Sequence, residues 1–139
     1  MSSIVQTQTT SFKKELYQGI HDLSTDTIYI ALYTAAADLN AATTAYSSTN
    51  EVVASGYTAG GQVMTGVSIS SDGYTAYVNW DNASWTASLT ARCALMYNAS
   101  KGNKSVAVLD FGSDKTSVGT FLITMPANTA TAALIRSSN

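Results

Sequence analysis

The stretch TIYIALYT, residues 27–34, determines the expected fold class of this chain. It is rich in isoleucine, tyrosine and threonine, which favour β-strands. Because successive side chains point to opposite faces of a strand, positions 28, 30 and 32 form one face and positions 29, 31 and 33 form the other. Both faces are apolar, so we expect this strand to be covered on both sides by other parts of the chain.

One short helix is expected just before this strand. Phe12, Leu16 and Ile20 recur every fourth residue and form an apolar stripe, which is typical of a helix that packs on a core. A threonine or serine at residues 10–11 can cap its start, and the pattern ends near residues 21–22. The stripe is a natural cover for one face of the strand at residues 27–34.

The remainder of the chain has the pattern of short strands separated by turns. The Asp72-Gly73 pair lies between residues 62–69 and residues 74–80 and predicts a hairpin. Further strands are expected at residues 91–97, 105–111, 118–125 and 131–136, with turns at residues 101–104 and 112–115. Residues 35–50, rich in Ala, Thr and Ser, are expected to form an excursion.

These elements predict an all-β fold, a jelly-roll-like β-sandwich of about seven or eight strands with one short N-terminal helix. The first ten residues are polar and show no amphipathic period. We therefore expect an N-terminal arm at residues 1–10 and a single β-sandwich domain at residues 11–139.

The composition is unusually poor in charge. Asp, Glu, Lys and Arg make up 12% of the 139 residues, about half of the ~25% of an ordinary domain, whereas Ala, Ser and Thr contribute 20, 18 and 19 residues. With a net charge of −2, such a surface resists association only weakly, which suits a protein covered by partners. A monomer with a hydroxyl-rich β surface fits the composition equally well. The seven basic residues are scattered, so nucleic acid is not an expected partner.

No residue pattern indicates catalysis, a cofactor or a metal. The chain has one histidine, His21, and one cysteine, Cys93, and neither has sequence neighbours that would make a catalytic or metal site. Asp110-Phe111-Gly112 spells a kinase triplet without the other kinase motifs and is interpreted as the end of a strand. No signal peptide and no membrane-spanning run are expected. The expectation is a protein that is not an enzyme and that is made in a cytoplasm.

Two tryptophans are the strongest aromatic candidates for binding. Trp80 follows the apolar face of its strand and is expected in the core, whereas Trp85 lies beside a polar turn and is the better candidate for an interface. In the arm, Ile4 and Val5 are apolar residues that could order on a neighbouring molecule. Ile4, Val5 and Trp85 are therefore the predicted partner contacts.

Several segments together resemble the auxiliary capsid proteins, called cement or decoration proteins, of short-tailed bacteriophages. The resemblance extends over most of the chain from residue 11 onward and is carried by SFKKEL (11–16), GIHDL (19–23), DTIYIALYT (26–34), YSSTNEV (46–52), GYTAGG (56–61), ARCALMYN (91–98) and VLDFGSDK (108–115). It implies a jelly-roll-like fold and no catalytic residues.

The resemblance also implies a location and partners. The expected location is the virion, on the outer capsid surface, where the protein binds the major capsid protein and stabilises the shell. Self-association is expected, with a homodimer favoured over a trimer. Two alternatives share the absence of chemistry: a tail or neck adaptor, and a carbohydrate-binding module associated with a fibre.

Overall fold

The computed structural model describes residues 3–138, and its core is a five-stranded antiparallel sheet. The strand order in this main sheet is β1-β8-β7-β2-β3, and the smaller sheets are β10-β5-β4 and β6-β9. The elements are, in chain order, β1 (Thr7–Gln8), α1 (Thr10–Tyr17), β2 (Ile28–Tyr33), β3 (Gln62–Val63), β4 (Ser68–Asp72), β5 (Thr75–Asn79), β6 (Ala83–Trp85), β7 (Thr90–Asn98), the 3₁₀ helix η1 (Ala99–Lys101), β8 (Lys104–Thr116), β9 (Phe121–Ile123) and β10 (Ile135–Ser137).

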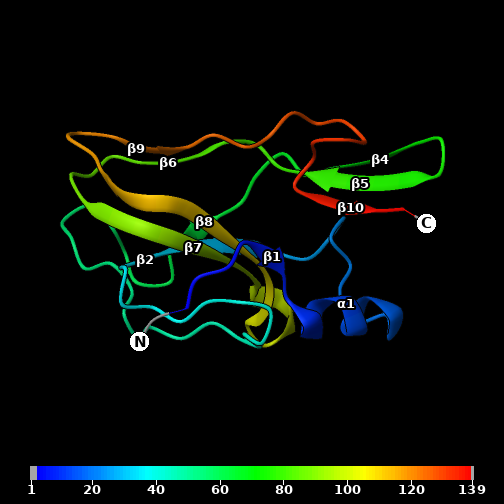
Figure 1. Cartoon of the computed structure of the whole chain (residues 1–139), viewed down its shortest axis with the longest axis horizontal. Helices are drawn as coiled ribbons and strands as arrows, with labels where there is room; N and C mark the ends of the chain where they lie inside the picture. Colours follow the sequence, from blue (N-terminus) through cyan, green and yellow to red (C-terminus); the bar gives the residue numbers. More distant parts are fainter. Residues whose placement is uncertain (1–2, 139) are drawn as a thin grey trace.

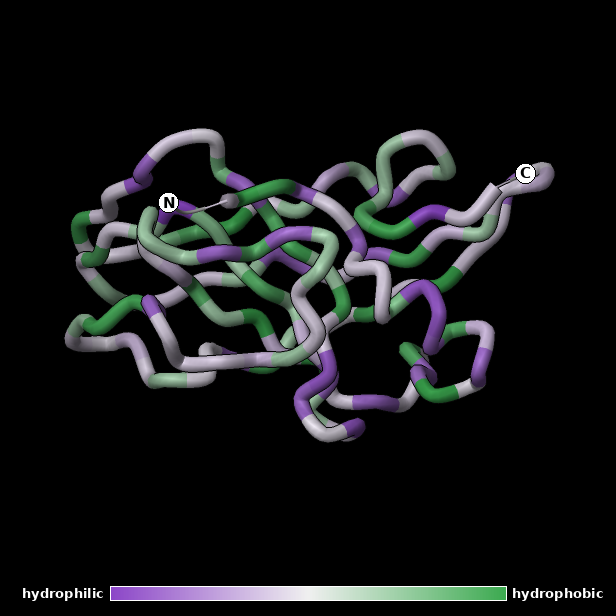
Figure 2. Tube along the Cα trace, turned by 60° about the horizontal axis from the view of Figure 1, so that its bottom comes forward, coloured by the Kyte–Doolittle hydropathy of each residue, from purple (hydrophilic) through white to green (hydrophobic). Residues whose placement is uncertain are grey.

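The sheets are arranged as a sandwich with the helix at one end. In Figure 1 the sheet β6-β9 lies above the main sheet, the sheet β10-β5-β4 lies to its right, and α1 lies below β10-β5-β4. In Figure 2 the apolar positions (green) recur along the strands in the interior, and polar positions (purple) lie mainly on peripheral segments. The expected all-β, sandwich-like fold with one short helix is confirmed. The strands are more numerous and many are shorter than expected.

Strand β2 lies inside the main sheet with a packed core on each face. On one face, positions 28, 30 and 32 belong to the larger core, which also contains Trp80, Trp85 and Phe121 from the opposing layer. On the other face, Ala31 and Tyr33 join a smaller core with Cys93, Leu95 and Val108. The prediction that this strand is covered on both sides is therefore confirmed.

The cover of the second face is made of irregular chain rather than of a helix. Residues 35–50 fold back under the main sheet, where Ala37 and Leu39 are buried in the smaller core. Of the predicted helical stripe only Phe12 is buried, and it belongs to the larger core; Leu16 is 39% exposed. The helix thus contributes only the Phe12 ring, to the larger core, and residues 35–50 cover the second face of β2.

Helix α1 begins and ends where local capping chemistry dictates. The N-cap is Thr9, one residue before the expected caps, and its side chain accepts a hydrogen bond from the backbone N–H of Phe12. At the other end Gly19 adopts φ 73°, and the N–H groups of Gly19 and Ile20 donate to the carbonyls of Leu16 and Glu15. This is a Schellman motif, which stops the helix at Tyr17 rather than near residues 21–22.

The expectation of a separate N-terminal arm is wrong for residues 3–10, the part of the arm that the structure describes. Thr7 and Gln8 form β1, which pairs with Val108 and Ala107 of β8. Thr9 is fully buried and bonds through its hydroxyl to that of Ser105 at 2.9 Å. The segment is an edge strand of the main sheet. Residues 1 and 2, and residue 139 at the end of the predicted domain, lie outside the described residues.

The turn expected at residues 112–115 is a bulge inside one long strand. Strand β8 continues to Thr116, and residues 111–114 lie opposite the single residue Arg92 of β7. Gly112 accommodates the irregularity with φ 84°. Gly112 does interrupt the regular strand, but β7 is long enough to pair with β8 again beyond the interruption.

Candidate interaction surface

An apolar groove lies between α1 and the underside of the β10-β5-β4 sheet. Its volume is about 290 Å³. Its walls come from Leu16 of α1, from His21 and Leu23 after the helix, and from one face of the small sheet. In Figure 1 the small sheet extends over the helix at the right of the molecule. The groove is therefore bounded by the small sheet on one side and by α1 with the chain that follows it on the other.

The strand register explains why the sheet side of the groove is apolar. Ile135, Val78 and Ile69 lie opposite one another on β10, β5 and β4, so their side chains form one row across the sheet. Burial decreases along this row: Val78 is 5% exposed and Ile135 7%, whereas Ile69 is 54% exposed. The row begins in the core and ends in solvent.

The exposed members of the groove would gain stability from a partner. Leu16 and Ile69 are 39% and 54% exposed, so a partner that covered their remaining surface would contribute about half of the ~1.5–3 kcal/mol of a fully buried side chain each. Tyr17, at the end of α1, and Tyr74, in the β4–β5 turn, are 94% and 95% exposed. Two aromatic rings thus lie free on the elements that bound the groove.

A polar network fixes the inner end of the groove. His21 Nε2 lies 2.9 Å from Glu15 Oε1, and His21 Nδ1 lies 2.9 Å from Asn98 Nδ2. Because the Asn98 amide donates to Nδ1 and to Asp26, the hydrogen bonds place the histidine proton on Nε2, where it donates to Glu15. Every polar atom of the His21 ring is therefore used in holding α1 to the end of β7.

Asp26 ties the same network to the 3₁₀ helix. Its carboxylate accepts from Asn98 at 2.8 Å and pairs with Lys101 at 3.2 Å. Burial alone raises the pKa of Asp26, but the hydrogen bonds from Asn98 and the Asp22 backbone, with the charge of Lys101, outweigh it and lower the pKa. The ion pair is structural: it anchors the loop before β2.

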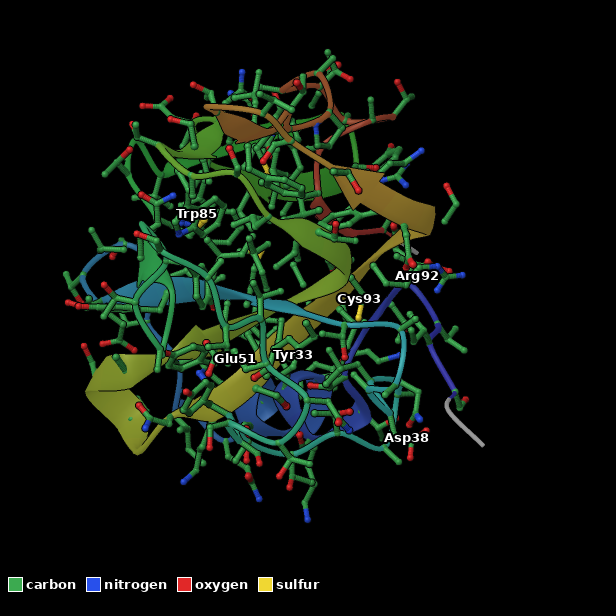
Figure 3. The ribbon with its side chains drawn as sticks, turned by 90° about the vertical axis from the view of Figure 1, so that its left-hand side faces the viewer. Tyr33, Asp38, Glu51, Trp85, Arg92 and Cys93 are labelled. Carbon is green, nitrogen blue, oxygen red and sulfur yellow. The ribbon has the colours of Figure 1, made fainter. Side chains whose placement is uncertain are left out.

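A second polar cluster, on the other face of the main sheet, surrounds Glu51. This glutamate is 7% exposed and accepts from the Tyr46 hydroxyl at 2.6 Å, the Tyr57 hydroxyl at 2.5 Å and the Gly60 N–H at 2.8 Å. Glu51 also bridges to Tyr33 of β2, beside which it lies in Figure 3. Three donors meet one carboxylate, so the cluster fixes the ends of the loop between residues 46 and 60.

The tyrosines of this cluster remain protonated donors. Burial, followed by the Glu51 hydrogen bond, raises the pKa of both Tyr46 and Tyr57 well above the usual value. Tyr97, whose hydroxyl donates to the Gly60 carbonyl at 2.6 Å, has its pKa raised by burial to about 12. The arrangement closes a loop on the sheet, and each polar group has a structural partner.

The structure separates the three predicted partner contacts. Ile4 is half-buried and packs on the smaller core, where it bridges to Leu39, and Val5 is 50% exposed. Trp85 is 6% exposed and packs against Tyr57 and Phe121 with ring centroids at 6.0 and 6.3 Å. In Figure 3 it lies across β2 from Glu51.

The expectation that Trp85 is an exposed anchor is therefore wrong. Position 85 alternates with the exposed Ser84 on a strand that faces the main sheet, so the side chain points inward. Trp80 is also buried, at 5% exposure, as expected. The exposed apolar residues of the groove were missed because Leu16 and Ile69 follow ordinary core periodicities, and sequence spacing does not reveal where a covering layer stops.

Comparison with family models, curated proteins and solved structures found no match to this chain. Within residues 3–138 no helix has the length and apolar character needed to cross a membrane. In the same range no three His, Cys, Asp or Glu side chains are grouped so as to hold a metal ion.

Proposed function

We propose that this chain is a non-enzymatic structural protein of a bacteriophage virion, which binds the major capsid protein on the outside of the head and stabilises the shell. The observation that carries the proposal is the exposed apolar groove on a chain with very little charge. Apolar surface of this kind is buried when a partner docks, and few charges have to be desolvated for docking.

The use of the polar residues supports the same proposal. The side chains of His21, Glu51 and Asp26 are set into the fold, and their hydrogen bonds connect one part of the chain to another. The thiol of Cys93 is buried, and burial raises its pKa to about 12, which keeps it protonated and unreactive. These groups stabilise a rigid scaffold.

Stabilisation of a shell would follow from mass action. A protein that binds the assembled head and not the open one shifts the equilibrium toward the head by RT ln(1 + [L]/Kd) per site, about 2.7 kcal/mol at a hundredfold excess over Kd. Repeated over many sites, a modest affinity is sufficient. The proposal therefore requires a high copy number rather than tight binding.

The alternative of a carbohydrate-binding module loses its main support. The stacking platform for this alternative would consist of Trp80, Trp85 and the many tyrosines. Both tryptophan rings are buried, and only tyrosines such as Tyr17 and Tyr74 remain exposed. The tail or neck adaptor shares the docking chemistry with the capsid proposal and differs from it in copy number.

The test is co-sedimentation of the purified protein with phage heads that lack it. We expect saturable binding at a copy number near that of the major capsid protein, together with greater heat resistance of the heads. Absence of binding would contradict the capsid proposal and favour the tail adaptor. Binding at a few copies per head would do the same.

A pair of helix variants tests whether the groove is the contact. Leu16→Glu places a charge in the groove, whereas Gln18→Glu adds the same charge at an exposed position at the end of α1. We expect Leu16→Glu to weaken head binding at least tenfold, because a charge would be buried in an apolar contact, and Gln18→Glu to leave it unchanged. Equal effects of the two variants would exclude the groove.

A further inference from the structure

Strand β4 has a free outer edge that distinguishes it from the other outermost strands. It is the last strand of the β10-β5-β4 sheet and is five residues long, whereas the strands that bound the three sheets elsewhere have two or three residues. Among residues 3–138 no segment pairs with its outer edge. Four of its five residues are exposed. An edge of this kind is a ready template for another strand.

Strand β4 also lacks the devices that protect the edges of monomeric sheets. It contains no lysine and no proline, its register with β5 has no bulge, and its one charge, Asp72, lies at the end. The part of β8 that extends beyond β1 also has a free edge, but side chains bond to its backbone N–H groups. There Gln6 Oε1 accepts from the Asp110 N–H, and the Asp110 side chain accepts from the Gly112 N–H.

The turn geometry identifies which backbone groups of β4 face outward. Gly73 and Tyr74 form a two-residue turn, with Gly73 at φ 60°, closed by the pair Asp72 and Thr75. The closing pair of such a hairpin exchanges both backbone hydrogen bonds, and these alternate along an antiparallel ladder. The N–H and C=O groups of Ile69 and Ser71 therefore point away from β5.

We propose that a second copy of this chain binds at this edge, with its own β4 antiparallel to the first and Ser70 opposite Ser70 of the partner subunit. Ile69 then faces Ser71 of the partner subunit, and the symmetry repeats the contact. This register is the one antiparallel arrangement in which both outward residues of both copies pair, and it forms four backbone hydrogen bonds.

Charge favours this antiparallel register over a parallel one. Asp72 lies opposite Ser68 of the partner subunit, about 14 Å from the partner's Asp72 at ~3.4 Å per residue. This separation exceeds the Debye length of ~8 Å at physiological salt. A parallel pairing would place the two carboxylates side by side. Because the chain has a net charge of only −2, little long-range repulsion opposes the approach.

The consequence is a continuous six-stranded sheet with both grooves on one face. Residues directly opposite one another in an antiparallel pair point to the same side. The row of Ile135, Val78 and Ile69 thus continues into Ser71, Ala76 and Ser137 of the partner subunit. The dimer would present two copies of the apolar groove side by side. This inference does not depend on the proposed function.

Disulfide trapping tests the register directly. In the proposed dimer the two Ser70 residues form a non-hydrogen-bonded pair with Cα atoms about 4.5 Å apart, within the range of a disulfide. Ser70→Cys should therefore give a covalent dimer under mild oxidation. Ser68→Cys is the matched control, because its two copies would lie about 14 Å apart. The native Cys93 is buried and does not compete.

Sedimentation measurements test the same interface without cross-linking. A ladder of five residues buries less surface than a standard interface of ~1,600 Å², so the dimer should be weak. The wild-type protein is therefore measured up to high concentration. We expect a dimer that Ser71→Lys abolishes, whereas Ser113→Lys, at an exposed position on β8, leaves it intact. A wild-type monomer at all concentrations, or equal cross-linking through Ser68→Cys, would overturn the proposal. Binding to phage heads is measured in a separate assay, so the proposed dimer and the proposed capsid function can each fail without the other.

Discussion

Replacement of Glu51 tests whether the buried carboxylate holds the loop between residues 46 and 60. Glu51→Leu removes the acceptor for the hydroxyls of Tyr46 and Tyr57 and for the Gly60 N–H. Tyr46 lies nearer the surface, where water can replace the carboxylate, but Tyr57 is 8% exposed. A buried donor without a partner costs about 1–3 kcal/mol.

The expected loss for Glu51→Leu is about 3 kcal/mol in the free energy of unfolding. This value assigns the full penalty to Tyr57 and Gly60 and allows for the favourable burial of the leucine side chain. Glu51→Gln should cost only about 1 kcal/mol, because its amide oxygen can still accept from Tyr57 and Gly60 while its NH₂ donates to the Tyr46 hydroxyl.

Urea unfolding followed by tryptophan fluorescence measures both variants. With a slope near ~1.5 kcal/mol/M, the Glu51→Leu midpoint should fall by about 2 M and the Glu51→Gln midpoint by less than 1 M. A double-mutant cycle with Tyr57→Phe provides the control, because that change should cost much less once Glu51 is leucine. If Glu51→Leu stays within 1 kcal/mol of wild type, or if the cycle shows no coupling, the carboxylate does not hold the loop.

Three further changes probe other contacts. Gly61→Ala should destabilise the protein by at least 2 kcal/mol in urea unfolding, because Gly61 has φ 81° and a Cβ there would lie 1.8 Å from the Ile30 carbonyl oxygen; an effect below 1 kcal/mol would contradict the close approach. Trp85→Ala should cost about 3–5 kcal/mol by the same assay, and Tyr74→Ala, at an exposed ring, less than 0.5; similar losses would contradict the burial of Trp85. Asp26→Asn should make the free energy of unfolding less dependent on pH in the acid range. The folded pKa of Asp26 lies below the unfolded value of 3.8, so its carboxylate stabilises the fold above pH 3.8 and loses this effect as the pH falls through the folded pKa. The stabilities of wild type and variant should therefore converge in acid titrations.

The sequence predicted the elements whose apolar period is long and whose turns carry their own chemistry. Strand β2 could be identified with both faces covered because its six residues are apolar on both faces. The hairpin of β4 and β5 could be located because Gly73 marks its turn, although the two turn residues are Gly73 and Tyr74 and Asp72 belongs to β4. In both cases the decisive interactions are local or follow from a simple alternation.

The errors concern residues whose environment is set by distant parts of the chain. Residues 3–10 have no amphipathic pattern, and they are ordered because β8, about a hundred positions later, offers them an edge. Trp85 follows a polar turn, and its burial depends on β9 and Tyr57. No local pattern encodes such pairings.

The same limitation applies to the candidate surface. Ile69 follows a core alternation, and its exposure arises only because the β10-β5-β4 sheet extends beyond the layer that covers it. The Glu51 cluster could not be assembled from sequence either, because its donors come from a loop with no regular period. Charge depletion suits a surface covered by partners, but it does not indicate where on the fold such a surface would lie.

The pairing of the N-terminal segment with β8 has a consequence for the order of events during synthesis. Thr9 bonds to a residue 97 positions later in the chain, so the first strand leaves the ribosome long before its partner exists. The smaller core, which needs Ile4, Leu39 and Val108 together, can close only after Val108 has emerged. Contacts of such long sequence separation slow folding. The nascent chain therefore remains open on that side of the sheet until β8 has been synthesised.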